Sequence, residues 1–226
     1  MRRRIEEDQK FLDAAGSVPS VNITTYYEVE NKPQLDDYPK MKDWLILMVT
    51  KWLQHPDRIL TTSDGMRPIV FVYNPGNTQC AKLDLWKQAL DEVQGVYHVR
   101  PVLVVDMADN LQTRCTNHSS RDFIWHEYAP PPSEGYTETW AYHKRQTITI
   151  RPGFWRHSGR QAQQQRRLTD WQSKVNWANN RHAQHFQLIT SWNEWLEMSS
   201  VEPGVEWWSS SGLGSYLDIL AQFPPQ

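Results

Sequence analysis

Residues 191–203, SWNEWLEMSSVEP, carry three carboxylates and two tryptophans. They follow a short apolar run over residues 185–190, which predicts a buried strand. Paired carboxylates suit the hydrolysis of glycosidic bonds, because one carboxyl group protonates the leaving oxygen while a second carboxylate stabilises or attacks the sugar. Indole rings offer flat amphipathic faces to a ligand. The stretch is therefore either an ordinary solvated turn or a site that combines acid–base groups with a surface suited to a sugar.

Glu194 and Glu197 form the candidate catalytic pair. They lie three residues apart, and on a helical turn this spacing brings the two Cβ atoms within about 5–6 Å. At such a distance one carboxyl group can keep its proton beside the charge of the other and serve as the acid. Trp192 and Trp195 would shield the pair or stack on a sugar ring. Because the same E-x-x-E spacing is common on solvated helices, spacing alone does not identify a catalytic pair.

The rest of the chain alternates short apolar runs with helical patterns. The predicted strands span residues 21–27, 68–73, 100–106, 122–126, 147–151 and 185–190. Helical spacing of apolar residues predicts helices over residues 36–54, 81–93, 161–180 and 215–221. The centre of the first of these, residues 44–49, is compatible with a buried strand, but the length of the pattern favours a helix. Nearly continuous apolar strands that alternate with helices predict an α/β fold with a parallel sheet.

Polar and aromatic residues cluster where the predicted strands finish. In parallel barrels and open α/β sheets, the carboxyl ends of the strands hold the functional site. Any one such residue is explained by a polar loop, but all six strand ends together indicate a concave site. The predicted substrate-binding residues are Tyr26, Glu28, Tyr73, Asp106, His126, Glu127, Tyr128, Trp155, Trp192, Asn193, Trp195 and Glu202.

Length and charge limit the classes of partner. The 226 residues carry a formal net charge of -2 with a pI near 6.4, which removes the electrostatic case for nucleic acid as a partner. No apolar stretch approaches the ~20 residues that span a bilayer. Neither a repeat period nor a low-complexity linker interrupts the chain, so we expect one domain over residues 1–226.

The cysteines and histidines give little indication of a metal site or a disulfide. Cys80 and Cys115 lack the C-x-x-C spacing, so we expect free thiols rather than a zinc site or a disulfide framework. A metal hydrolase that uses Asp106, His126 and Glu127, or the pair His182 and His185, is an alternative, although the two later histidines lie in a polar stretch that favours solvation.

Two N-x-S/T sequons occur, at residues 22–24 and 117–119, and they have meaning only in a secreted protein. Asn22 opens a predicted buried strand, which argues against glycosylation there. The N-terminus lacks the apolar core of a secretory signal. Secretion fits a truncated chain, whereas a cytoplasmic location fits a complete one.

Residues 190–197, TSWNEWLE, and residues 201–203, VEP, resemble the signature of the glycoside hydrolase family 99-like proteins, which include endo-α-mannosidases and O-antigen biosynthesis proteins. The segments 26–28, 71–73, 125–128 and 152–155 are similar to the family's earlier strand ends, in the same order. The likeness covers most of the chain from about residue 21, and its last element is the specific one.

This resemblance implies a (β/α)8 barrel that acts on an α-mannoside or a similar glycan. The family's reaction retains the anomeric configuration and is thought to pass through a 1,2-anhydro sugar. Carried over to this sequence, Glu194 draws the proton from the sugar 2-hydroxyl and Glu197 is the general acid/base at the leaving oxygen. The resemblance implies no metal and no cofactor.

The sequence departs from the family's pattern in two respects. Met198 replaces a glycine, and methionine is strained there if the position requires a positive φ. The six predicted strands match the family's third to eighth, so the chain looks N-terminally truncated relative to the family, and an incomplete barrel has unpaired edges. The alternative function is therefore a non-catalytic glycan-binding domain or an orphan barrel remnant.

Overall fold

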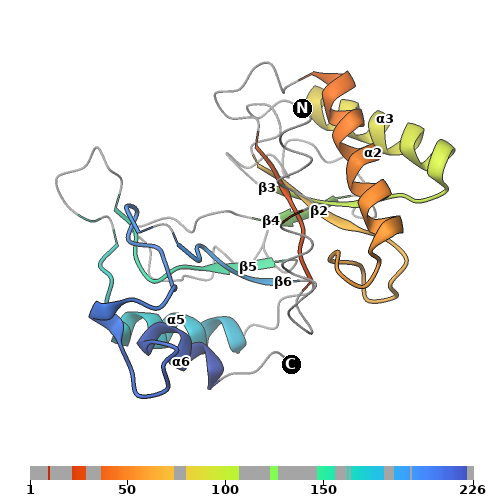
Figure 1. The fold of residues 1–226 in the computed structure, drawn as a ribbon. Coiled ribbons are helices and arrows are strands. Elements are labelled where there is room, and N and C mark those ends of the chain that lie inside the picture. Colours follow the sequence, from red (N-terminus) through yellow and green to blue (C-terminus); the bar gives the residue numbers. More distant parts are fainter. Residues whose placement is uncertain are drawn as a thin grey trace. The chain divides into compact units, whose positions relative to one another are not determined.

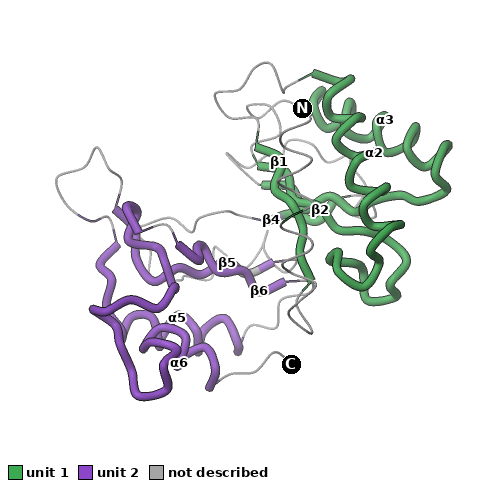
Figure 2. Tube along the Cα trace, viewed as in Figure 1, with its two compact units in different colours: residues 1–125 green, residues 126–226 purple. Residues whose placement is uncertain are grey.

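The computed structural model describes residues 10, 22–28, 37–73, 80–106, 123–126, 147–155, 162, 164–180, 186–193 and 195–222. These residues form six strands and four α-helices that alternate along most of the chain (Figure 1). The chain divides into two compact units, Met1–Trp125 (unit 1) and His126–Gln226 (unit 2), shown in Figure 2. In the described ranges we find no helix with the length and apolar character needed to cross a membrane. The predicted α/β class is confirmed.

A parallel four-stranded sheet forms the first half of the structure. Its strands are β1 (Tyr26–Glu28), β2 (Ile69–Tyr73), β3 (Val102–Asp106) and β4 (Phe123–His126), hydrogen-bonded in that order. Tyr27 lies opposite Val72, and Val70 lies opposite Leu103. Every residue of β3 and all but the last residue of β2 are buried. The strands therefore read as continuous apolar runs because both of their faces are covered.

Two helices, α2 (Tyr38–Gln54) and α3 (Cys80–Tyr97), pack with this sheet around one hydrophobic core (Figure 1). The Asp37 side chain begins α2 by accepting a hydrogen bond from the Lys40 backbone N–H at 3.0 Å. Met41, Leu45, Met48 and Val49 are buried at helical spacing, so residues 44–49 are helical and not a strand. In the core, the Trp86 ring meets the Tyr27 ring edge-on, with centroids 5.2 Å apart.

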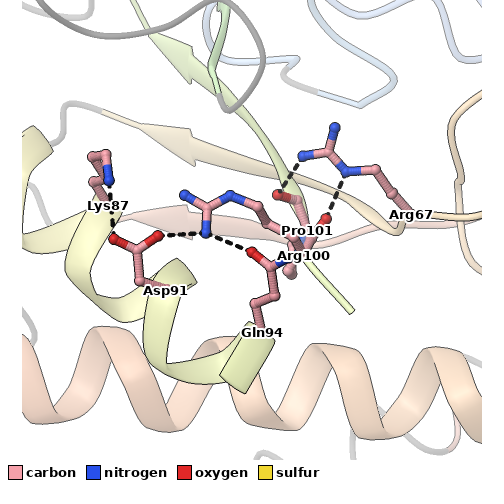
Figure 3. Close-up of polar contacts among 6 residues, drawn as sticks. All are labelled: Arg67, Lys87, Asp91, Gln94, Arg100 and Pro101. Carbon is pink, nitrogen blue, oxygen red and sulfur yellow. Dashed lines mark hydrogen bonds and ion pairs between the residues drawn. The ribbon is translucent and has the colours of Figure 1, made fainter. Parts of the chain in front are cut away.

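A polar network ties α3 to the amino ends of β2 and β3 (Figure 3). The Arg100 guanidinium donates to Asp91 Oδ1 at 2.6 Å and to Gln94 Oε1 at 3.0 Å. Lys87 donates to the other oxygen of Asp91 at 2.9 Å. Arg67, which precedes β2, donates from Nε to the Arg100 carbonyl at 2.7 Å. This end of the sheet is therefore held by side chains with a structural task.

Unit 2 contains a pair of parallel strands, β5 (Thr147–Ile150) and β6 (Phe186–Ile189), in which Thr149 lies opposite Leu188. Its helices are α5 (Leu168–Asn179), the short 3-10 helix η4 (Val205–Trp207) and α6 (Ser215–Ala221). Ile150, Trp171, Val175 and Tyr216 are core residues. The Trp171 indole N–H donates to the Tyr216 carbonyl at 3.0 Å, which fixes α6 against α5.

The structure confirms all six predicted strands and shifts some boundaries. The last of them, β6, was predicted to be buried, but its residues alternate between half-buried and exposed. The predicted helix over 161–180 begins only at Leu168, because Gln164 forms an antiparallel bridge with Phe154 instead of a helical turn. Of the first predicted strand, Tyr26 and Tyr27 lie in the sheet, while Ile23 makes an isolated bridge with Ile59. The eight-stranded barrel and the single domain over residues 1–226 stay predictions.

The expectation of free thiols is wrong for Cys80. This residue opens α3 and is disulfide-bonded. Spacing along the sequence did not indicate the bond, because a disulfide depends on which residues the folded chain brings together. Cys115 lies outside the described residues.

Candidate functional site

The carboxyl edge of the four-stranded sheet carries four of the predicted substrate-binding residues. Glu28, Tyr73, Asp106 and His126 are the last residues of β1, β2, β3 and β4. Parallel strands end at the same edge, so these four residues end neighbouring strands at one edge of the sheet. Glu28 lies directly opposite Tyr73 in the register. Asp106 and His126 are buried, with 6% and 2% of their surface exposed.

Tyr26 adds an aromatic ring to this edge. Side chains two residues apart on a strand point to the same face, so Tyr26 and Glu28 share one face of β1 while Tyr27 is buried on the other. The Tyr26 ring lies 6.0 Å from the Tyr73 ring and 5.6 Å from the Phe71 ring, measured between centroids. Unit 1 therefore presents a carboxylate beside a pair of tyrosine rings.

In unit 2, residues 190–193 and 195–202 form a compact loop after β6, which we call the β6 loop. The Ser191 N–H donates to the Ser199 carbonyl at 2.9 Å, and the Val201 N–H donates to the Ser191 carbonyl at 3.0 Å. The two serine hydroxyls also lie 3.1 Å apart. The chain thus leaves β6, turns, and returns to Ser191, so the described residues of the loop lie together at the end of the strand.

Glu197 lies on the turn of this loop and is tied to the segment after β5. Its backbone carbonyl accepts a hydrogen bond from the Trp155 N–H at 2.8 Å. Both residues are half-buried. A Cβ on Gly153 would lie 2.9 Å from Arg166 Cβ and 3.0 Å from the Met198 carbonyl, so only glycine allows this close approach. The structure therefore brings together Trp155 and Glu197, two residues that the sequence analysis selected separately.

Trp195 is held at the edge of its ring, while the residue as a whole remains 40% exposed. Its indole N–H donates to Glu202 Oε2 at 2.8 Å. A Cβ on Gly204 would lie 2.6 Å from Trp195 Cη2, so the ring rests against the backbone of that glycine. Trp192, 54% exposed, and Asn193, also exposed, lie on the same loop. Glu202, predicted to bind substrate, thus has a definite second task in positioning the Trp195 ring.

Arg166 is a residue of this region that the sequence analysis missed. Its guanidinium lies 4.2 Å from the Trp207 ring centroid and 4.2 Å from that of Tyr216. Nη1 donates to Ser200 Oγ at 2.9 Å, so Arg166 joins the β6 loop to η4 and α6. Burial lowers its pKa from the ordinary arginine value. The Gln/Arg-rich sequence around it reads as a solvated helix face, so no local pattern identifies it.

Lys174 was missed for the same reason. It is buried in α5, and its ammonium donates to the Arg151 carbonyl at 2.8 Å and to the Pro152 carbonyl at 3.4 Å. Burial, followed by the charge of Arg151, lowers the pKa of Lys174 to about 8. Lys174 therefore satisfies the backbone where the chain leaves β5 toward Trp155.

Met198 adopts the left-handed conformation, with φ of 57°. The glycine that the resemblance places here has no steric penalty in that region, whereas a residue with a Cβ does. Its N–H donates to the Trp195 carbonyl at 3.0 Å, which closes the turn that carries Glu197. The sequence predicted strain at Met198 on the condition that its φ is positive, and the structure meets that condition.

Several predicted residues fall outside the described part of the chain: Glu194, Glu127, Tyr128, His182 and His185. Within the described ranges, no three His, Cys, Asp or Glu residues cluster in a way that could hold a metal ion. Comparison with models of protein families, with curated proteins and with solved structures finds no match. A function is therefore proposed below from the residues of this chain and their geometry.

Proposed function

We propose that this protein is a glycoside hydrolase that acts on α-linked, mannoside-like glycans and retains the anomeric configuration. The observation that supports this most directly is the β6 loop, in which Glu197 lies on a closed turn whose backbone is hydrogen-bonded to Trp155. The turn begins with Trp195, whose ring is anchored by Glu202. A carboxylate beside exposed indole faces is suited to protonating a glycosidic oxygen while the sugar rings stack.

We propose Glu194 and Glu197 as the catalytic pair. Glu194 takes the proton of the sugar 2-hydroxyl as that oxygen attacks C1, the glycosidic C1–O bond breaks, and Glu197 protonates the departing oxygen. Water then opens the 1,2-anhydro sugar, with Glu197 accepting the proton of the water and Glu194 returning a proton to the 2-oxygen. Two inversions at C1 give net retention. The remaining predicted substrate-binding residues would contact the glycan at the strand ends.

We further propose that these strands belong to a (β/α)8-type barrel. The support is that the four strands of the first sheet, and both β5 and β6, carry their chemically capable residues at or just after the carboxyl ends. This is the arrangement in which a barrel assembles one site from several loops.

A second candidate is a non-catalytic glycan-binding domain or barrel remnant. Two observations favour it. Met198 occupies a left-handed position, which strains the turn carrying Glu197. Trp192 and Trp195 are exposed and thus available to stack on sugars without any chemistry.

The test is to incubate the full chain with α-linked mannan oligosaccharides and to separate the products by mass. Glu197→Gln and Glu194→Gln keep the side-chain size but remove the acid, so both should abolish cleavage. Glu206→Gln, an exposed carboxylate of η4, is the matched control for the loss of one negative charge and should cleave like the wild type. Thermal melting of each variant checks that it is folded.

Binding of the same oligosaccharides, measured by calorimetry, separates the two candidates. Cleavage that is lost in both glutamine variants, with binding kept, establishes the hydrolase. Binding without cleavage by the folded wild type, weakened in Trp195→Ala, establishes the binding domain. If the folded protein shows no binding and no cleavage, both proposals are refuted.

A further inference from the structure

We propose that Asn22 is an acceptor for N-linked glycosylation and that the glycan lies at the amino edge of the unit 1 sheet. Asn22, Ile23 and Thr24 form an N-x-T sequon. This inference is independent of the proposed hydrolase function. It depends on three features of the described residues: the exposure of Asn22, its position relative to the sheet, and the disulfide at Cys80.

Asn22 is exposed, which corrects the interpretation that it opens a buried strand. Strand β1 begins only at Tyr26, and the first backbone pairing is made by Ile23, whose N–H donates to the Arg58 carbonyl at 2.8 Å. The Asn22 amide nitrogen lies 3.5 Å from the Ile59 carbonyl, the outer limit for a hydrogen bond. A glycosylated amide nitrogen keeps one N–H, so even this contact survives modification.

The position of Asn22 keeps a glycan away from the candidate site residues of the same unit. Thr24 Oγ1 donates to the Ile69 carbonyl at 2.6 Å, and the Phe71 N–H donates to the Thr25 carbonyl at 3.1 Å. Residues 24 and 25 therefore run beside the start of β2, at the amino edge. Glu28 lies at the carboxyl edge, on the order of 20 Å away at about 3.3 Å per residue. A glycan on Asn22 would thus leave the row of strand ends open.

The disulfide at Cys80 points to the compartment that glycosylation requires. Disulfides form and persist in oxidising environments and are rare in the cytosol. Transfer of glycans to N-x-T sequons takes place in the same secretory compartment where disulfides form. The sequon and the disulfide lie on different segments, Asn22 before β1 and Cys80 at the start of α3, so they are independent observations.

The modification is a transfer of an oligosaccharide from a lipid diphosphate donor, catalysed by an oligosaccharyltransferase. The Asn22 amide nitrogen attacks C1 of the first sugar and loses one proton. The N–C1 bond forms, the bond from C1 to the phosphate oxygen breaks, and the lipid diphosphate leaves with the bonding electrons. The Thr24 hydroxyl is the part of the sequon that the transferase recognises, and the transfer precedes the hydrogen bond to Ile69 because it occurs on the nascent chain.

The test expresses the full chain behind a cleavable secretion signal in cultured animal cells, in an Asn117→Gln background that removes the other sequon. The secreted protein is treated with peptide N-glycosidase in heavy-oxygen water, and peptides are mapped by mass. The expected result is conversion of Asn22 to aspartate that carries heavy oxygen. Asn22→Gln and Thr24→Ala should lose the glycan, whereas Thr24→Ser, which keeps the hydroxyl, should retain it.

An unmodified Asn22 in secreted protein whose Cys80 is disulfide-bonded would overturn the proposal. So would a glycan that persists in Thr24→Ala, because the attachment would then not follow the sequon. Because the transfer acts on the nascent chain, a variant that folds poorly still reports on modification when the cell-associated protein is mapped.

Discussion

Glycine at position 198 is expected to make the protein more stable than alanine at the same position. Met198 has φ of 57°, and a left-handed conformation costs a residue with a Cβ about 1–2 kcal/mol. Glycine removes that cost but adds about 0.4–1 kcal/mol of conformational entropy to the unfolded chain. The Met198→Ala variant keeps the Cβ while removing the rest of the side chain. The net gain of Met198→Gly over Met198→Ala is therefore about 0.8 kcal/mol, within a range of about 0–1.6 kcal/mol.

The assay is urea unfolding of both variants, with the free energy of unfolding compared at equal slope. His98 is the matched positive control, because it has φ of 58°, is exposed and follows the last residue of α3, so its glycine variant should also exceed its alanine variant. Leu196, an exposed residue of the same turn without a positive φ, should show the opposite order. If Met198→Gly is no more stable than Met198→Ala while His98 behaves as expected, the strain at Met198 is refuted.

Three further predictions concern the packing and charge of the structure. Gly153→Ala should lower the free energy of unfolding by about 1–3 kcal/mol, because the new Cβ meets Arg166 and Met198. Gly95→Ala in α3 is the control: an added Cβ there has no neighbouring atom within 4 Å, so this change should stabilise the helix. Equal effects of the two changes in urea titrations would contradict the close approach at Gly153. The pKa of Lys174 is lowered to about 8 from 10.5, so between these pH values the unfolded state binds more protons than the folded state, and the stability of the wild type should rise with pH. Urea unfolding at several pH values should show a weaker rise for Lys174→Met. Parallel pH profiles of the two proteins would argue against a depressed pKa. Reduction of the disulfide at Cys80 should lower the free energy of unfolding by about 2–4 kcal/mol, measured by thermal or urea unfolding. The stability of Cys80→Ala should not respond to the reductant. A wild type that does not respond either would show that the bond contributes nothing.

The sequence alone determined the strands and most helices. The runs that became β2 and β3 are continuous and apolar because a parallel strand covered on both faces admits little else, and this requirement is visible locally. The buried positions of α2 recur at helical spacing for the same kind of reason. Residues at the strand ends, such as Glu28 and Asp106, could be selected because parallel strands bring their carboxyl ends to one edge.

Only the tertiary structure decided which distant residues meet. Gln164 pairs with Phe154 and so delays the start of α5, and Glu202 positions Trp195. The polar sequence around Arg166 and Lys174 does not indicate that Arg166 is half-buried and Lys174 buried. Aromatic rings around Arg166 and backbone carbonyls around Lys174 come from other elements and replace water there. Such contacts join residues whose separation along the chain sets no pattern, so they depend on the path of the whole backbone and not on local periodicity.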